Sequence, residues 1–118
     1  MKNEATGLRR IFCALRFSLQ GLKSCYQSET AFKQEVWASI FLLPLSFWVT
    51  SDSIERALLI TPIIIVLAVE IMNTAIESVV DRIGSEYHEL SAKAKDLGSA
   101  AVLMSLLLVI ITWSIILL

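Results

Sequence analysis

Residues 97–118 read LGSAAVLMSLLLVIITWSIILL and form the longest stretch of the sequence without a charged side chain. A helix that spans a membrane needs about 17–25 mostly apolar residues, so these twenty-two residues are enough for one span by themselves. Hydrophobic residues make up 56% of the 118 residues, whereas about 45–50% is usual in a soluble globular domain. The stretch and the composition together predict a helical integral membrane protein.

Two shorter uncharged stretches precede it. Residues 36–51 contain sixteen residues without a charge, and residues 57–69 contain thirteen. Each is short for a span, so the first helix is expected to begin near Thr30 and the second to continue past Glu70. We therefore predict one all-α domain over residues 1–118, with membrane spans at 30–50, 53–83 and 91–118. A soluble three-helix bundle is the alternative, but it would need polar helix faces that these stretches lack.

The first 28 residues have a different pattern. Apolar side chains recur at the helical period along one stripe, while Arg9, Arg16 and Lys23 recur every seven residues along its flank. The stripe consists of Leu8, Ile11, Phe12, Leu15, Leu19, Leu22 and Tyr26. This pattern is typical of an amphipathic helix that lies flat on a membrane and binds anionic lipid head groups. Residues 1–28 are therefore expected to form a surface helix.

Lysine and arginine residues are concentrated on one side of this predicted topology. Six lie in the N-terminal part up to Glu35 and three lie in residues 82–96, whereas the outer turn has Arg56 alone and none follows the last span. Because basic loops stay in the cytoplasm, the N-terminus and residues 82–96 are predicted to be cytoplasmic and the C-terminus to be outside. Cys13 and Cys25 are then expected to be free thiols. The net charge of -1 gives no basic field for nucleic acid.

The second predicted span carries polar side chains on one face. Glu70, Asn73, Thr74, Glu77 and Asp81 fall within a sector of about 100° on a helix with about 3.6 residues per turn. If Asp81 lies at the cytoplasmic surface, Glu77 lies about 6 Å and Glu70 about 16 Å below it. A carboxylate inside a bilayer costs about 2.5 kcal/mol or more, so the stripe indicates a functional site. Snorkelling of Glu77 and a packing role for Asn73 are the structural alternatives.

Charged side chains at the predicted cytoplasmic ends surround this stripe. They include Glu29, Lys33, Glu35, Glu86, His88, Lys95 and Asp96. Carboxylates of this kind can bind a hard divalent cation, and cationic groups can bind phosphate. A carboxylate in apolar surroundings, such as Glu70, can act as a general base on a hydroxyl that stays in the membrane. The set permits phosphoryl transfer to a lipid alcohol, although a proton or cation path would use the same residue types.

Three sequence blocks carry a resemblance to a known family. The block from Glu70 to Ser91 contains E-x-x-N-T-A-I-E-x-x-x-D, which leads into DRIGSEYHELS at residues 81–91. The others are AKDLGSAAV at residues 94–102 and ETAFKQE at residues 29–35. Together they resemble the prokaryotic integral-membrane diacylglycerol kinase family over nearly the whole chain. The resemblance implies a homotrimer in the bacterial inner membrane, with active sites shared between subunits at the cytoplasmic face. It also implies transfer of the ATP γ-phosphoryl group to the primary hydroxyl of diacylglycerol, which gives phosphatidic acid.

The resemblance implies roles for individual residues as well. Glu70 matches the general base, with Asn73 beside it, and Glu29 and Glu77 match the ligands of a magnesium ion that bridges the ATP phosphates. Nucleotide contacts are implied for Arg10, Phe17, Glu29, Glu77, Glu86, His88, Lys95 and Asp96. Lipid contacts are implied for Arg10, Gln34, Glu35, Trp48, Glu70, Ser99 and Trp113. The implied partners are ATP, diacylglycerol, membrane lipids and other copies of the chain.

The sequence departs from the family pattern mainly in the surface helix. Phe17 stands where a tyrosine is often found, so a hydroxyl contact to nucleotide is missing there, and Leu19, Gln20 and Tyr26 replace more aromatic and basic residues. The DRIGSEYHELS loop and the N-terminal helix favour the proteobacterial form over the undecaprenol kinase relatives. Two other functions stay open, namely a small ion-translocating protein that uses the Glu70–Glu77 stripe and a regulatory subunit of a larger membrane complex.

Overall fold

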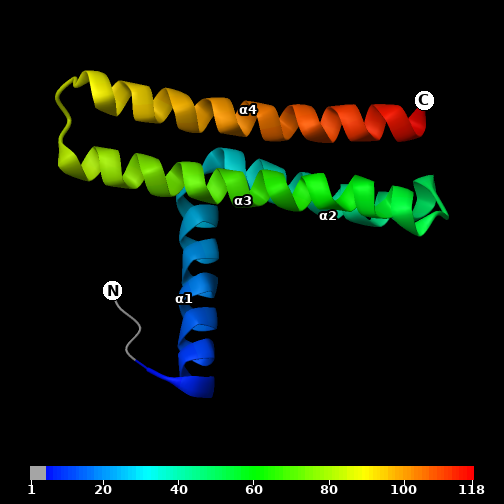
Figure 1. Ribbon diagram of the computed structural model, residues 1–118, viewed down its shortest axis with the longest axis horizontal. Helices are drawn as coiled ribbons and strands as arrows, with labels where there is room; N and C mark the ends of the chain where they lie inside the picture. The colour runs from blue at the N-terminus through cyan, green and yellow to red at the C-terminus, as the bar shows by residue number, and fades with distance from the viewer. Residues whose placement is uncertain (1–4) are drawn as a thin grey trace.

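The computed structural model describes residues 5–118, which form four α-helices. α1 covers Gly7–Ser28, α2 covers Thr30–Val49, α3 covers Ser53–Ile83 and α4 covers Glu89–Leu117. α2, α3 and α4 run alongside one another as a bundle, whereas α1 leaves the bundle across their direction (Figure 1). The described residues contain no β-strand, so the all-helical prediction is confirmed.

The helix bounds differ slightly from the predicted segments. α3 has the bounds predicted for the second span, and α2 ends one residue before the predicted end at 50. α1 starts at Gly7, and the first four residues of the predicted surface helix lie outside the described residues. α4 begins two residues before the predicted start at Ser91, because His88 caps it and its ring Nδ1 accepts a hydrogen bond from the Leu90 N–H at 3.1 Å. An imidazole nitrogen can thus satisfy a free N-terminal amide of a helix, as a serine hydroxyl does.

The turn between α2 and α3 is fixed by its own side chains. The Asp52 carboxylate accepts a hydrogen bond from the backbone N–H two residues on, at 2.8 Å, and so caps α3. Glu55 accepts from the Thr50 hydroxyl at 2.7 Å, and Arg56 donates to the Thr50 carbonyl oxygen at 2.8 Å. Arg56, the one lysine or arginine of this turn, therefore helps to close it.

Two of the bundle helices, α3 and α4, are long and apolar enough to cross a membrane by length and composition. α2 is not apolar enough to meet the same criterion. Three polar residues near its start, Lys33, Gln34 and Glu35, limit its uncharged part to residues 36–49. Large apolar side chains of α4 point outward, as at Ile115, which is 72% exposed. A soluble protein would rarely expose so continuous an apolar surface, so the surface is that of a membrane protein.

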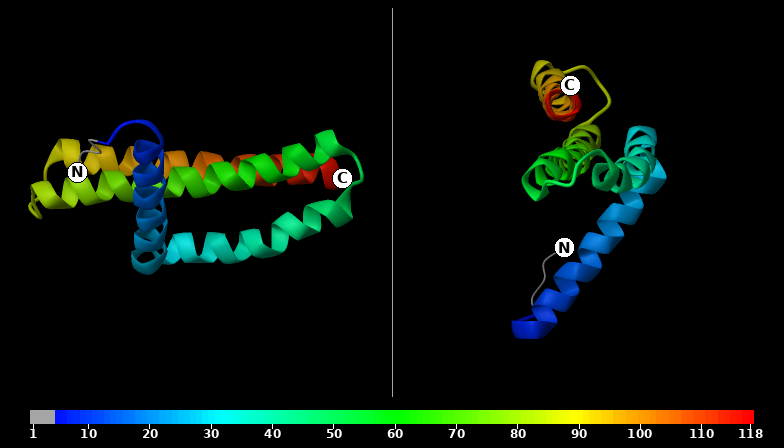
Figure 2. Two further views of the ribbon diagram at one scale, coloured as in Figure 1. Left: turned by 90° about the horizontal axis from the view of Figure 1, so that it is seen from below. Right: turned by 90° about the vertical axis from the view of Figure 1, so that its right-hand side faces the viewer.

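α3 is the central helix and packs against α4, α2 and α1 (Figure 2). A core of Leu59, Ile63 and Trp113 joins α3 to α4 near the end of the bundle that carries the C-terminus. The Trp113 indole N–H donates to the Leu59 carbonyl oxygen at 3.1 Å. Apart from Asp52, Glu55 and Arg56 in the turn between α2 and α3, this end of the bundle is apolar, and most of the charged side chains of the bundle helices lie at the other end.

Candidate active site

The polar stripe of α3 faces two different neighbours. Asn73 lies on the side of α4, against Gly98, and Thr74 lies on the side of α1, where the Cys25 thiol donates to its hydroxyl with an Sγ–Oγ1 distance of 3.7 Å. On a helix with about 3.6 residues per turn, Glu70 and Glu77 fall between these two directions. The two carboxyl groups therefore face the space between α4 and the corner formed by α1 and α2.

Glu70 is a buried acid, and only 6% of its surface is exposed. Its Oε2 atom has no hydrogen-bond partner, and the same holds for Glu35 Oε2 and Asn73 Oδ1. All three are oxygen acceptors, and leaving such a group buried without a donor costs about 1–3 kcal/mol. A ligand that brings hydroxyl donors or a cation would satisfy them.

Asn73 lies one turn from Glu70 along α3 and contacts Glu77, which is one turn nearer the loop that joins α3 to α4. The Asn73 Nδ2 atom donates a hydrogen bond to Glu77 Oε1 at 2.8 Å. This bond fixes one oxygen of the Glu77 carboxylate and leaves the other available. Gly98 makes room for the Asn73 amide, since a Cβ atom at position 98 would overlap Asn73 Oδ1.

The acidic groups of the site come from two parts of the chain. Glu29 is the residue between α1 and α2, and Glu35 lies in the second turn of α2. Glu29 and Glu35 are both partly buried, as is Glu77 on α3. Within residues 5–118, no three acidic, histidine or cysteine side chains form a group that could hold a metal alone. Mg²⁺ is usually held by one or two carboxylates together with phosphate oxygens and water, and two carboxylates, one from the α1–α2 corner and one from α3, fit that number.

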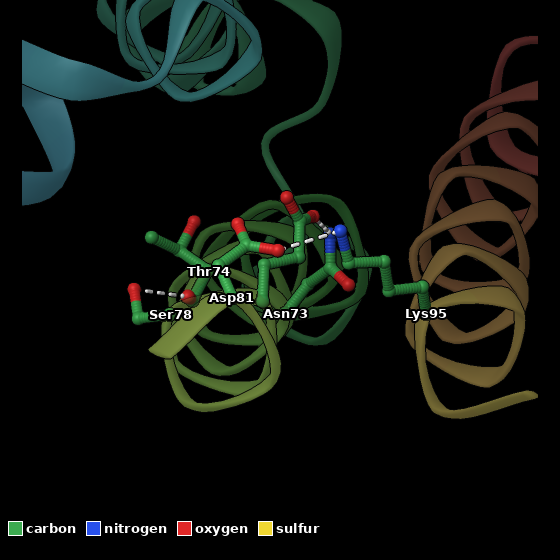
Figure 3. Close-up of polar contacts among 6 residues, drawn as sticks. Asn73, Thr74, Ser78, Asp81 and Lys95 are labelled. Atoms are coloured by element: carbon green, nitrogen blue, oxygen red, sulfur yellow. Dashed lines mark hydrogen bonds and ion pairs between the residues drawn. The ribbon is translucent and has the colours of Figure 1, made fainter. Parts of the chain in front are cut away.

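A cleft of about 370 Å³ lies beyond Glu77, between the end of α3 and the start of α4. Its lining includes Asp81, Glu86, His88 and Lys95. The Lys95 ammonium pairs with Asp81 at 2.7 Å across the two helices. Figure 3 shows Lys95 reaching from α4 to the side of α3 that carries Asn73, with Ser78 on the opposite side. The positively charged ammonium group of Lys95 thus lies between the cleft and the acidic groups.

The structure does not bring all the predicted site residues together. The N-terminal half of α1, which carries Arg10 and Phe17, points away from α4 and the cleft (Figure 2). Gln34, Asp96 and Ser99 are exposed near the charged end. The two tryptophans lie toward the other end of the bundle, where Trp48 is 90% exposed and Trp113 is 8% exposed in the core.

Comparisons with known proteins bear on this arrangement. The profile of the family described as prokaryotic diacylglycerol kinase matches residues 16–117. The chain belongs to this family. It is 50% identical over 117 residues to the diacylglycerol kinase of Escherichia coli (strain K12), which covers 99% of this chain and 96% of that protein. It is 46% identical to the diacylglycerol kinase of Haemophilus influenzae, over 93% of each chain, and 43% identical to that of Pseudomonas aeruginosa, over 96% of this chain and 92% of that one.

Membership of the prokaryotic diacylglycerol kinase family confirms the resemblance found in the sequence and identifies the chain as an enzyme of the kinase class. Several contacts of the packed chain have no signal in the sequence. The pairing of Lys95 with Asp81 and the contact of Cys25 with Thr74 join different helices, and no spacing within one helix indicates them. The close approach of Gly98 to Asn73 had a weak signal, because glycine in a membrane helix is typical of close helix packing.

Proposed function

We propose that the chain transfers the γ-phosphoryl group of ATP to the primary hydroxyl of diacylglycerol and so makes phosphatidic acid. The observation that carries the proposal is the buried Glu70 carboxyl group, whose Oε2 atom lacks a hydrogen-bond partner, in a chain of the prokaryotic diacylglycerol kinase family. The group lies where the apolar part of the bundle meets its charged end. A lipid alcohol and a water-soluble nucleotide can meet at that border.

The three bundle helices are proposed to cross the bacterial inner membrane together, with α1 lying in the cytoplasmic interface. The contact of Cys25 with Thr74 then puts the membrane surface at the level of Thr74. Residues 53–74 of α3 extend about 33 Å and the 20 residues of α2 about 30 Å, and the hydrocarbon layer of a bilayer is about 30 Å thick. This match supports α2 as a third span. The excess of basic residues on the α1 side favours a cytoplasmic N-terminus and an outer C-terminus.

This surface level changes the depths of the two acidic residues. Glu77 lies about 4.5 Å on the cytosolic side of Thr74 and Glu70 about 6 Å on the bilayer side, rather than both lying below a surface at Asp81. The last turns of α3 and the first turns of α4 extend beyond the level at which α1 leaves the bundle (Figure 1). Glu77 would therefore meet the nucleotide in water, and Glu70 would meet the lipid hydroxyl just inside the apolar layer.

Glu70 is proposed as the general base. Its free oxygen would accept the proton of the diacylglycerol hydroxyl as the hydroxyl oxygen forms a bond to the γ-phosphorus of ATP. The bond from the γ-phosphorus to the bridging oxygen breaks, and ADP leaves with that oxygen. Asn73 would contact the same region through its unpartnered Oδ1 atom. Positioning of the two substrates, rather than covalent chemistry by the protein, supplies most of the rate in such reactions.

Glu29 and Glu77 are proposed to hold Mg²⁺. Asn73 binds one oxygen of Glu77, so the other oxygen can face the metal. When bound, Mg²⁺ neutralises negative charge on the ATP phosphates. Glu29 is half-buried at the corner of α1 and α2, one turn after Cys25, whose thiol contacts Thr74 between Glu70 and Glu77 on α3, which supports a position close to the reacting groups.

The nucleotide is proposed to lie in the cleft at the charged end, with Glu86, His88, Lys95 and Asp96 around it. Arg10 and Phe17 point away from this cleft within one chain. The surface helix of a neighbouring copy would supply them, which supports a homotrimer with shared sites. Gln34, Glu35 and Ser99 would contact the lipid near its head, together with Arg10 and Glu70. Trp48 would lie along its acyl chains, whereas Trp113, which is buried in the core between α3 and α4, is not proposed as a lipid contact.

Purified protein in mixed micelles with Mg²⁺ and ATP tests the proposal. Diacylglycerol and undecaprenol are offered in turn, and the phosphorylated lipid is identified. We expect phosphatidic acid with the first and little product with the second. Glu70→Gln should abolish transfer while the protein keeps its oligomeric size and helical content. Glu55→Gln is the matched control, because it lies in the outer turn and its amide oxygen can still accept from Thr50.

The outcomes separate the alternatives. Near-normal turnover of Glu70→Gln would remove Glu70 as the base. A preference for undecaprenol would keep the site and change the lipid. Ion flux into vesicles without ATP consumption would favour ion translocation, and no ATP consumption with any lipid would favour a regulatory subunit.

A further inference from the structure

The corner between α1 and α2 consists of a single residue. Glu29 has φ -113° and ψ 112°, outside the helical region, between α1 ending at Ser28 and α2 beginning at Thr30. Its N–H donates to the Cys25 carbonyl oxygen at 2.9 Å, and its carbonyl oxygen accepts from the Lys33 N–H at 3.1 Å. The backbone bonds of both helices thus meet at the residue that we propose as a metal ligand.

Because the corner consists of one residue, a small change of angle there moves the far end of α1 by a large distance. Arg10 lies about 28 Å along α1 from Glu29, so a swing of only about 10° at the corner would move it by about 5 Å. Within one chain, α1 packs on α2 and α3. Contacts close to the corner therefore fix the angle inside the chain, before the membrane surface or a neighbouring copy acts on the far end of α1.

One such contact is a pair of aromatic side chains on the exposed side of the corner. The Trp37 indole Nε1 donates a hydrogen bond to the Tyr26 hydroxyl at 3.0 Å. The Lys33 ammonium lies 5.7 Å from the centre of the Tyr26 ring. Lys33 and Trp37 are one turn apart on α2, so the same face of α2 binds Tyr26 twice. Trp37 is 55% exposed, so burial of apolar surface does not account for this contact.

Cys25, the residue before Tyr26, connects α1 to α3, the helix that carries Glu70 and Glu77. Cys25 is 4% exposed and contacts Thr74 of α3, and Phe32, which is 3% exposed, fills the inner side of the corner. Tyr26 therefore holds α1 to α2 while Cys25 holds it to α3. Glu29 follows these two attachments by three and four residues, so its position relative to Glu70 and Glu77 depends on both.

We propose that the hydrogen-bonded pair of Tyr26 and Trp37 is a positioning device that fixes the corner and presents Glu29 to the metal. Neither residue touches a substrate; both act through Glu29. The role of the pair in holding the corner depends on the geometry alone, whereas its effect on the metal rests on the proposed function of Glu29.

Two single variants and their double test the device. Tyr26→Phe keeps the ring and removes the acceptor, and Trp37→Phe removes the donor. In a Cys13→Ser background, Cys25 is the only thiol and reports whether α1 separates from α3. We expect Cys25 to react about two- to tenfold faster with a maleimide in each variant, the range to which one neutral hydrogen bond corresponds. The Mg²⁺ concentration for half-maximal rate should rise by about the same factor while kcat at saturating Mg²⁺ changes little.

Because the two residues share one bond, the double variant should be no worse than either single variant. Phe41→Leu is the matched control, since Phe41 lies one turn further along α2, is 71% exposed and has no part in the site. It should leave both readouts as in the parent protein.

The results that contradict the proposal are separate from those that contradict the proposed function. Unchanged labelling of Cys25 in both single variants would overturn the device. Faster labelling with an unchanged Mg²⁺ requirement would also overturn it, provided that Glu29→Ala raises that requirement. If Glu29→Ala has no effect on the Mg²⁺ requirement, the metal assignment fails instead, and an altered labelling rate alone then supports the pair as a device that holds the corner.

Discussion

The backbone of Gly98 on α4 lies directly against the side-chain amide of Asn73 on α3. A Cβ atom at position 98 would overlap Asn73 Oδ1, and the other atom of the amide, Nδ2, donates to Glu77 at 2.8 Å. The close packing of α3 on α4 and the orientation of Glu77, a proposed metal ligand, therefore depend on the absence of a side chain at position 98.

Gly98→Ala should lower kcat/KM by about tenfold or more. The added methyl group would turn the Asn73 amide or push α4 away, and a hydrogen bond to a charged group contributes about 1.5–3 kcal/mol. Rates with Mg²⁺ and ATP in mixed micelles measure the effect. The control is Gly21→Ala, because no described atom lies within 4 Å of a Cβ atom there. That variant should keep its activity and gain up to about 1 kcal/mol of helix stability. Equal behaviour of the two variants would contradict the role of Gly98.

The helices of the bundle could be predicted because their signals are local. Uncharged stretches give their number, and Asp52, as a capping residue, marks the start of α3 where the structure has it. α4 begins at Glu89, two residues before the expected start of the last span, because His88 caps it and histidine is not among the residues that usually cap helices. Local chemistry thus gave the elements with errors of one or two residues.

The level of α1 along α3 could not be predicted in this way. The charge pattern alone suggested a membrane surface at Asp81, but the packing of Cys25 on Thr74 favours a level seven residues deeper. The link between Tyr26 and Trp37 and the pairing of Lys95 with Asp81 are likewise properties of the packed chain. Residue types and spacing identified the acidic stripe, while its neighbours became known only from the arrangement of the helices.

Lys95 should contribute to nucleotide binding more than to the stability of the fold. It and Asp81 are both well exposed, with 46% and 64% of their side chains accessible, so their ion pair adds little to stability. We expect Lys95→Met to raise the KM for ATP by about tenfold, since a charge-assisted hydrogen bond to phosphate is lost. Asp81→Asn should leave that KM unchanged or lower it. The Lys95 ammonium would then no longer have to break its ion pair with the Asp81 carboxylate before it binds phosphate.

Steady-state kinetics at saturating diacylglycerol measure both variants. Lys93→Met is the control, as Lys93 is an exposed lysine on the same helix, two residues away. A large rise in KM for Asp81→Asn would show that the carboxylate orients the lysine instead of competing for it.

The apolar stripe of α1 should determine how firmly this helix lies on the membrane. Leu19 is 58% exposed on that stripe, and burying a leucine in an apolar layer contributes about 1.5–3 kcal/mol. Leu19→Glu should therefore speed amide hydrogen exchange in α1 by about tenfold or more in lipid nanodiscs. Gln20→Glu adds the same charge about 100° further round the helix, outside the apolar stripe, and should change exchange little. Equal exchange in the two variants would argue against a membrane-bound stripe.

Cys25 should react more slowly with thiol reagents than Cys13, and only at higher pH. Burial raises the pKa of the Cys25 thiol, the hydrogen bond with Thr74 lowers it, and the negative charge of Glu29 and two other glutamates raises it further. Since the thiolate is the reactive form, a raised pKa leaves less of it at neutral pH. Cys13 is only partly buried on α1 and offers an internal comparison.

The pH dependence of alkylation, followed by mass spectrometry of the two labelled peptides, measures this difference. Glu29→Gln removes one of the charges that raise the Cys25 pKa, so the rate at Cys25 should increase at a given pH while the rate at Cys13 stays the same. If Glu29→Gln leaves the Cys25 profile where it was, the Glu29 carboxylate does not lie near the contact between α1 and α3. The corner would then present Glu29 elsewhere, and its pairing with Glu77 around a metal would lose its structural support.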